Sequence, residues 1–363
     1  MEENQHEDDR PEEQDASESP AQEGQEATRE DGLEADGLPD WVADGNAADI
    51  GYISTMMMKV QEEASKVLIG QGDLVQKLLV ALITGGNVLV EGVPGIAKTM
   101  TARTLARCIN AEFSRIQFTP DLMPADILGT TVFNVKESEF EFRKGPIFSN
   151  LILIDEVNRA PAKTQAALIE VMEERQVTIE GHSYSMEEPF FIMATQNPVE
   201  QEGTYKLPEA QMDRFLFRLK LHYPDLESEK AILERFQSDF QQRKEEEVQA
   251  VLTKEDLKKA QQIVESVHIK DELIDYLARI VIATRNNGDL YLGASPRASL
   301  GILRSAKAMA LIKGRGFVTP DDIKEVVYPV LNHRIILSHE REMEGMDTEE
   351  LIKGLIDDIE VPR

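Results

Sequence analysis

One eight-residue segment constrains the fold more than any other feature of this chain. It reads GVPGIAKT, spans residues 92–99 and joins a short β-rich run, Asn87–Glu91, to a helical stretch, Lys98–Ile109. The segment nearly matches the pattern G-x-x-x-x-G-K-[ST], in which backbone N–H groups and a helix N-terminus surround phosphate groups. A strand, a glycine-containing loop and a helix in this order predict a phosphate-binding unit, with a chance Gly/Pro turn as the alternative.

The positions of this segment have expected roles. Lys98 is expected to reach the β- and γ-phosphates of a nucleotide, and the Thr99 hydroxyl is expected to hold Mg²⁺. Ala97 stands where the pattern has its last glycine, and we expect alanine to be tolerated because a residue entering a helix needs no positive φ. The predicted nucleotide-binding residues here are Gly92, Val93, Pro94, Gly95, Ile96, Ala97, Lys98, Thr99 and Met100.

Polar side chains follow two further apolar runs. Leu151–Ile154 is followed directly by Asp155 and Glu156. The next run, Phe190–Ala194, leads to Asn197. Phosphoryl transfer needs one carboxylate beside Mg²⁺ and one group that orients or deprotonates the attacking water. Asp155 is therefore the predicted metal ligand, Glu156 the predicted base, and Asn197 a candidate to position the water; taken singly, a solvated acidic strand end and a turn-forming Asn are the alternatives.

The apolar pattern predicts the architecture. Three short apolar runs separated by helical segments favour a parallel sheet covered on both faces, with chemistry at the carboxyl ends of its strands. A first helix is expected from near Ile50, with Met56–Met58 as core filler. After Pro224 the pattern is helical, with a capping box at Thr253 and, at Thr319, a cap followed by a first-turn proline and acids. One buried helix face is predicted from a stripe at helical spacing: Leu273, Tyr276, Leu277, Ile280 and Val281.

We therefore expect an α/β nucleotide-binding domain over residues 49–224 and an all-helical domain over 225–363. The segment before them is strongly acidic: the chain of 363 residues has a formal net charge of −28, and residues 1–50 hold 18 Asp and Glu against two Arg. Such a segment cannot bury enough apolar surface to order itself, so residues 1–48 are predicted to be a disordered tail. It is interpreted as a solubilising tail or as a docking or autoinhibitory segment, with Trp41 as its one anchor.

Composition limits the classes of binding partner and the cellular compartment that we expect. The acidic balance argues against a protein that simply coats nucleic acid or anionic membrane. A single cysteine, Cys108, excludes an intrachain disulfide framework and is interpreted as buried filler. The N-terminus does not resemble a signal peptide, and no run of about 18 apolar residues is present. The expected location is the cytoplasm, and His333 and His339 by themselves are weak indications of a metal site.

Two insertions read as β-hairpins. Between Ile116 and Ile147 the residues alternate over Thr131–Val135 and Phe140–Phe142. The second insertion, Gln176–Phe191, turns at residues 180–182 and returns toward Pro189.

Together these segments resemble the MoxR family of AAA+ ATPases. The resemblance rests on GVPGIAKT, on LILIDE with its continuation VNRAPAKTQAALIEVMEERQ, and on ATQNP, LPEAQMDRF and GASPRAS. It runs from about Ile50 to about His339, and the paired hairpins resemble the branch that also includes magnesium chelatase subunits and replicative helicases. The resemblance implies an AAA+ P-loop core with a helical lid, a hexameric ring, and ATP with Mg²⁺ bound between subunits.

The resemblance also implies residue roles. Lys98 and Thr99 bind phosphate and Mg²⁺, Asp155 is the Walker B carboxylate, Glu156 the catalytic base and Asn197 the sensor 1 residue. Arg214 matches the arginine finger, with Arg218 as a rival. Arg297 matches the sensor 2 arginine, acting on its own or on the neighbour's nucleotide. The segment VLIGQ, which contains Ile69 and Gly70, matches the part that packs on adenine, although as bare sequence it is a helix end.

Three functions follow as hypotheses. The leading one is an ATP-driven, chaperone-like remodeller whose clients, in this family, are proteins with von Willebrand factor A domains. The second is a nucleic-acid motor, which would need Lys or Arg at its pore loops. The second hairpin instead carries Glu180, Glu187 and Glu188, and the first mixes both signs of charge. The third is a module in which nucleotide only sets the assembly state.

Overall fold

The computed structural model describes residues 44–93, 95–198, 203–237 and 247–362, which belong to one compact unit. Most of the predicted acidic tail, with Trp41, lies outside the described residues, and so does Pro94 of the phosphate loop. Within the described ranges, no helix is both long and apolar enough to cross a membrane.

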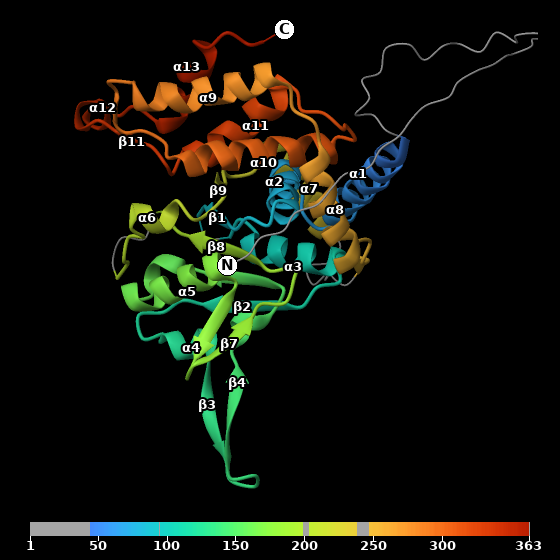
Figure 1. The fold of residues 1–363 in the computed structure, drawn as a ribbon, viewed down its shortest axis with the longest axis vertical. Coiled ribbons are helices and arrows are strands. Elements are labelled where there is room, and N and C mark those ends of the chain that lie inside the picture. The colour runs from blue at the N-terminus through green and yellow to red at the C-terminus, as the bar shows by residue number, and fades with distance from the viewer. Residues whose placement is uncertain (1–43, 94, 199–202, 238–246, 363) are drawn as a thin grey trace, which may run out of the picture. The chain divides into compact units, whose positions relative to one another are not determined.

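A five-stranded parallel sheet forms the centre of the α/β part (Figure 1). The strand order is β2-β5-β8-β1-β9, and the parallel pairing that the sequence predicts is confirmed. The strands are β1 (Val88–Glu91), β2 (Phe113–Gln117), β5 (Leu151–Asp155), β8 (Phe191–Gln196) and β9 (Phe217–Lys220). Because all five run the same way, the carboxyl ends of β1, β5 and β8 meet at one edge, called here the carboxyl edge. The opposite side, where the strands begin, is called the amino edge.

Both faces of the sheet are buried, which explains the near-continuous apolar strands. Along β5, Leu151 and Leu153 join one core cluster, whereas Ile152 and Ile154 join the other. The first cluster includes residues of α1 (Asp44–Ser65), α2 (Gly72–Ile83) and α3 (Lys98–Cys108). The second includes residues of α4 (Pro124–Leu128) and α5 (Ala162–Glu174). The expected sheet with helices on both faces is therefore confirmed.

The first helix differs from the sequence prediction in two details. It begins at Asp44, ahead of the expected start near Ile50. Of the three consecutive methionines, Met57 is buried and Met56 packs partly against the core, but Met58 is 54% exposed. The prediction that all three fill the core was wrong for Met58, because successive helical residues point about 100° apart and three in a row cannot share one face.

Helices make up most of the chain after β9. They are α7 (Leu226–Phe236), α8 (Lys254–Ser266), α9 (Asp271–Arg285), α10 (Pro296–Ile312), α11 (Pro320–Leu331), α12 (His339–Met343) and α13 (Thr348–Asp357). The capping boxes at Thr253 and Thr319 are present, and the predicted stripe on α9 is buried. One short antiparallel sheet of β10 (Leu290–Leu292) and β11 (Ile336–Leu337) was not predicted. The division at residue 224 stays a prediction, since α1 and α2 also contact α8 and α10.

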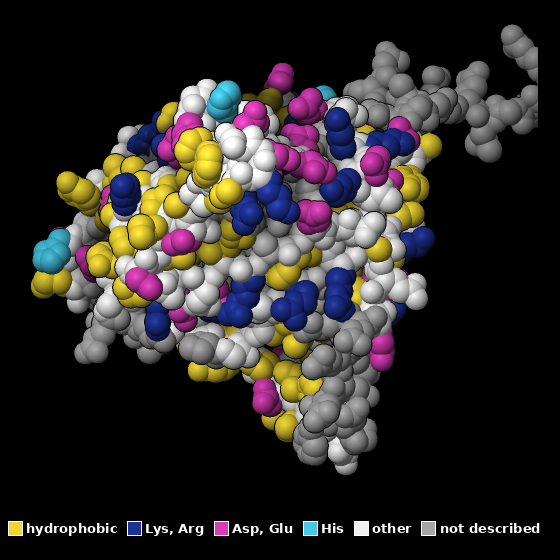
Figure 2. Space-filling model, turned by 90° about the horizontal axis from the view of Figure 1, so that it is seen from below, with side chains coloured by type: hydrophobic (Ala, Val, Ile, Leu, Met, Phe, Trp, Pro, Cys, Tyr) yellow, Lys and Arg dark blue, Asp and Glu magenta, His cyan; other side chains and the backbone are white. Residues whose placement is uncertain are grey.

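The two hairpins form where the sequence predicts them. The first pairs β3 (Gly129–Asn134) with β4 (Glu139–Lys144) and extends away from the central sheet in Figure 1. The second pairs β6 (Gln176–Ile179) with β7 (His182–Ser185). The rings of Phe142 in the first hairpin and Tyr184 in the second are in contact, with centroids 4.4 Å apart and planes tilted by 34°, so the hairpins touch. On the face shown in Figure 2, Lys and Arg side chains lie among acidic and hydrophobic ones.

Candidate active site

The phosphate loop follows β1 and leads into α3 at Lys98, as predicted. Gly95 has a φ of 90°, and Ala97, immediately before the helix, has a φ of 54° and a ψ of 22°. The expectation that Ala97 needs no positive φ was therefore wrong: the chain turns into the helix through a left-handed residue. A side chain in that conformation costs roughly 1–2 kcal/mol. Left-handed residues in a turn make successive N–H groups converge, which builds a concave anion site.

The predicted phosphate and metal residues line one pocket of about 440 Å³. Its walls come from the phosphate loop, the start of α3 and the ends of β5 and β8: Gly95, Ala97, Lys98, Thr99, Met100, Arg103, Asp155, Glu156 and Asn197. The Lys98 amine donates a hydrogen bond of 2.7 Å to the Gly92 carbonyl, which keeps this side chain folded over the loop. Three segments distant in sequence thus converge on one cavity.

Two unpredicted side chains orient Asp155. The Thr195 hydroxyl on β8 donates to Asp155 Oδ1 at 2.6 Å, and Arg115 Nη2 on β2 donates to Oδ2 at 2.6 Å. The same Thr195 oxygen accepts the backbone N–H of Glu156 at 3.0 Å. Both contacts depend on strand neighbours, because β2 and β8 flank β5 in the sheet. Asp155 is thereby held in one orientation, with a side-chain partner on each of its oxygens.

Glu156 has a left-handed backbone, with φ 57°, and side-chain partners on one oxygen. Gln117 at the end of β2 donates from Nε2 to Glu156 Oε2 at 2.8 Å, and Arg159 Nε lies 3.1 Å from the same atom. Gln117 was missed by sequence reasoning, although it ends β2 in register with Asp155. Asn197 is buried and lines the same pocket.

A second pocket of about 630 Å³ continues from the phosphate loop. Ile69 and Gly70 line it together with Gly95, the end of β9, α7 and α11. Gly70 has a φ of +71°, and a Cβ there would lie 2.5 Å from the Ser228 hydroxyl, so this position requires glycine. Gln71 ties the segment to the loop by donating to the Ile96 carbonyl at 3.2 Å. The predicted adenine segment therefore borders a cavity that adjoins the phosphate pocket.

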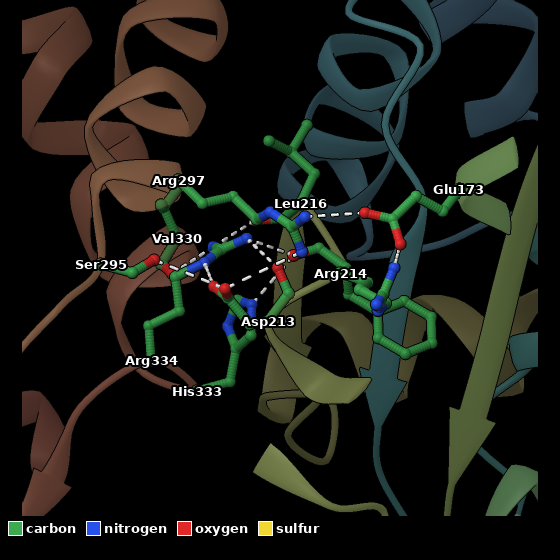
Figure 3. Close-up of polar contacts among 10 residues, drawn as sticks. Glu173, Asp213, Arg214, Leu216, Ser295, Arg297, Val330, His333 and Arg334 are labelled. Carbon is green, nitrogen blue, oxygen red and sulfur yellow. Dashed lines mark hydrogen bonds and ion pairs between the residues drawn. The ribbon is translucent and has the colours of Figure 1, made fainter. Parts of the chain in front are cut away.

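Arg214 and Arg297 line neither of these pockets. Arg214 precedes β9, and because β9 runs parallel to β1 with Phe217 opposite Val88, it lies at the amino edge. Arg297 lies in the first turn of α10. Figure 3 shows both guanidinium groups directed at Glu173: Arg297 Nη2 lies 2.7 Å from Oε1, and Arg214 pairs with Oε2. Together with Asp213, Arg304 and Arg334 they line a third pocket of about 320 Å³.

Comparison with known proteins agrees with this geometry. Residues 87–217 match the model of the ATPase family associated with various cellular activities, and residues 282–355 match the AAA lid domain. The chain is 42% identical to chaperone MoxR1 of Mycobacterium tuberculosis over 88% of this chain and 85% of that protein. The chain belongs to the MoxR family of AAA+ ATPases. A more distant family member, protein MoxR of Methylorubrum extorquens, is 27% identical over 84% of this chain and 94% of that protein.

A solved crystal structure has the same fold. The crystal structure of an ATPase candidate from Cytophaga hutchinsonii superposes with a TM-score of 0.80 at 43% identity, covering 89% of this chain and 98% of that one. The α/β AAA+ core with a helical lid, predicted from the motifs, is thus confirmed, and nucleotide binding is the activity that this family implies.

The remaining candidates in this MoxR-family chain have structural partners. Arg218 lies inside β9, where Nη2 donates to Glu91 Oε2 at 2.8 Å and Nη1 donates to the Asn332 carbonyl at 3.3 Å. It borders the second pocket rather than the third. Cys108 is buried, and burial raises the pKa of its thiol to about 12, so it stays protonated and unreactive.

Proposed function

We propose that this protein hydrolyses ATP at subunit interfaces of a ring, a hexamer as the family resemblance implies, and uses the cycle to remodel protein partners. One observation carries the proposal. The predicted phosphate residues line a pocket at the carboxyl edge, whereas Arg214 and Arg297 line a different pocket at the amino edge. Because they line a different pocket from the phosphate loop of their own subunit, the proposal assigns a neighbouring subunit's nucleotide as their target.

The phosphate pocket fits a triphosphate with Mg²⁺. Thr99 and Asp155 offer a hydroxyl and a carboxylate oxygen, the hard oxygen ligands that Mg²⁺ prefers, and the left-handed turn at Gly95 and Ala97 directs N–H groups inward. Bound Mg²⁺ would neutralise charge on the β- and γ-phosphates. The Lys98 amine would exchange its bond to the Gly92 carbonyl for phosphate oxygens.

Glu156 and Asn197 would act on the attacking water. Asn197 positions it, and Glu156 accepts its proton as the oxygen attacks the γ-phosphorus and the bond to ADP breaks. Gln117 and Arg159 hold Oε2 of Glu156, so the second oxygen of that carboxylate is the acceptor that the proposal assigns. The neighbour's Arg214 would stabilise negative charge that develops on the γ-phosphate, and Arg297 beside it points to action on that same nucleotide rather than on its own.

The hairpins would contact the client. At the tip of the first hairpin, Val135 and Phe140 are 80% and 73% exposed, and Phe133 packs on Phe140 with ring centroids 5.2 Å apart. Exposed apolar side chains of this size mark protein-binding surfaces more often than nucleic-acid ones. The clients proposed are proteins with von Willebrand factor A domains in the cytoplasm, as the family resemblance implies.

Trapping the ring with its client tests the proposal. Glu156→Gln should bind ATP but stall, so mass spectrometry of co-purifying proteins in ATP, against an ADP sample, should recover an A-domain protein only with ATP. Lys98→Ala, which should not bind ATP, serves as the matched control and should recover none. Nuclease-sensitive DNA, or salt-sensitive stimulation of ATP hydrolysis by DNA, would favour the helicase-like motor instead.

A further inference from the structure

A buried arginine in the lid contacts the chain around Arg214. Arg334 follows α11, and its side chain is only 3% exposed. Burying a guanidinium is costly unless each N–H finds an acceptor, and the group carries five. All five are used in this protein.

The acceptors cluster on the segment that carries Arg214. Arg334 Nη2 donates to the carbonyls of Asp213 at 2.9 Å and Phe215 at 2.6 Å, and Nη1 donates to Leu216 at 3.1 Å. Nη1 also donates to the carbonyl of Val330 on α11 at 2.6 Å. Figure 3 shows this side chain reaching from the lid into the loop before β9. The backbone on both sides of Arg214 is therefore fixed by one lid side chain.

The residues before Arg334 hold the same loop. His333 Nε2 lies 3.0 Å from the Phe215 carbonyl, and since a carbonyl only accepts, Nε2 carries the proton. Burial and the nearby Arg334 and Arg218 charges hold the pKa of His333 well below its usual value, so the ring is neutral. Asn332 Nδ2 donates to the Arg218 carbonyl at 2.9 Å. Three consecutive lid residues thus bind the start of β9.

Asp213 extends the contact to the second arginine. Its Oδ1 accepts Arg334 Nε at 2.7 Å, and its Oδ2 lies 3.9 Å from Arg297 Nη1. The Ser295 hydroxyl, at the start of α10, is 3.4 Å from the same Oδ2. The carboxylate therefore stands between the buried guanidinium and the one that Figure 3 shows beside Glu173.

The geometry points to Arg334 as a positioning residue for the pair Arg214 and Arg297: it fixes the backbone that carries Arg214 and, through Asp213, the orientation of Arg297. The inference rests on the proposed function, in which these two arginines act on the neighbour's ATP. Arg334 itself lines neither pocket at the carboxyl edge of its own subunit. A lid side chain therefore sets the geometry of the face presented to the next subunit.

Lysine cannot replace this arginine. Its ammonium keeps the charge but has three donors and no planar fork, so it cannot bind four backbone carbonyls and a carboxylate at once. We expect Arg334→Lys to lower kcat about 100-fold, the size of effect that a misplacement of about 1 Å produces. KM for ATP should stay at the wild-type value because Arg334 lines neither pocket at the carboxyl edge.

Removing both positioned arginines tests whether Arg334 acts through them. In an Arg214→Ala, Arg297→Ala background, adding Arg334→Lys should cause no further loss of kcat, since both positioned groups are gone. A further loss of the same size would overturn the inference. If Arg214→Ala leaves kcat unchanged, the proposed function fails; if it lowers kcat but Arg334→Lys does not, only the positioning role fails.

Three further experiments separate positioning from folding. Arg315→Lys alters another partly buried lid arginine, bonded to Asp322 at 2.6 Å, and should leave kcat unchanged. Asp213→Asn, at a site exposed enough to tolerate it, should lower kcat by less than Arg334→Lys at unchanged KM. Mixing Arg334→Lys with Lys98→Ala subunits should restore ATP hydrolysis, because Lys98→Ala supplies intact arginines. Absence of recovery would assign Arg334 to fold stability and overturn the inference.

Discussion

The two edges of the sheet carry different groups, held in different ways. At the carboxyl edge, a phosphate loop, two carboxylates and Asn197 line one pocket and are held by neighbouring strands. At the amino edge, Arg214 and Arg297 meet at Glu173 and are held by the lid. In the proposed function, the carboxyl edge holds a nucleotide and the amino edge completes another subunit's site. Neither edge would then by itself contain every group that hydrolysis needs.

Removing the phosphate-binding amine should have the largest effect. Lys98→Ala deletes the charge that would reach the β- and γ-phosphates, so ATP binding should be abolished. Titration calorimetry measures it, with Lys66→Ala, an exposed lysine paired to Glu63, as the control. Full affinity in Lys98→Ala would refute the assignment of the carboxyl edge.

Removing the amino-edge arginine should affect turnover but not binding. Arg214→Ala should lower kcat by about 10³-fold or more, the range known for arginine fingers, while ATP still binds. Steady-state kinetics and calorimetry on one sample separate the two effects, and Arg279→Ala on the exposed face of α9 is the control. A loss of ATP affinity equal to the loss of rate would place Arg214 at its own nucleotide.

Neutralising the base should lower the rate by about 10²- to 10⁴-fold with ATP still bound. Glu156→Gln keeps the side-chain shape and removes the proton acceptor. Phosphate release measures the rate, and Glu170→Gln on the exposed side of α5 is the matched control. An unchanged rate would remove Glu156 as base and favour a protein in which nucleotide only sets assembly.

The smallest expected effect is a pH dependence of stability from the lid contact. His333 has a pKa well below its usual value because it is buried beside Arg334, so the unfolded chain binds this proton more readily than the folded one. The contribution of His333 to the free energy of unfolding is therefore complete above about pH 6.5. It is lost as the pH falls below that value, by up to about 1.4 kcal/mol per pH unit. Thermal melts from pH 7.5 to 5.5 should show it.

The matched pair for that experiment is His333→Gln and His339→Gln. His339 is exposed at the start of α12, so its replacement should leave the acid sensitivity as in the wild type. In His333→Gln, the melting temperature should depend less on pH than in the wild type. Equal slopes in all three proteins would show that His333 is not the group responsible for the acid sensitivity.

Sequence could predict the carboxyl edge because each of its parts is a contiguous signal. The phosphate loop and the strand ends at Asp155 and Asn197 are short segments with local patterns, and parallel topology brings strand ends together. The side chains that contact the two carboxylates could not be predicted from the sequence. Arg115, Gln117 and Thr195 reach the carboxylates across strand pairs, and only the register of the finished sheet makes them neighbours.

The roles of Arg214 and Arg297 at the amino edge were predicted only by family resemblance. The lid side chain that holds this edge, Arg334, was not predicted. Arg334 contacts residues more than a hundred positions earlier in the chain, so no local pattern relates them. The left-handed backbone conformation of Ala97 was also not predicted, because the loop imposes it against the intrinsic preference of alanine.

The most direct test of the two-edge account is to mix two inactive variants. Lys98→Ala has a defective carboxyl edge and an intact amino edge, and Arg214→Ala has the reverse. In randomly mixed rings about a quarter of the interfaces join two intact edges, so ATP hydrolysis should reappear at roughly that fraction of the wild-type rate. Mixtures that stay inactive at every ratio would contradict the claim that each site is shared between two subunits.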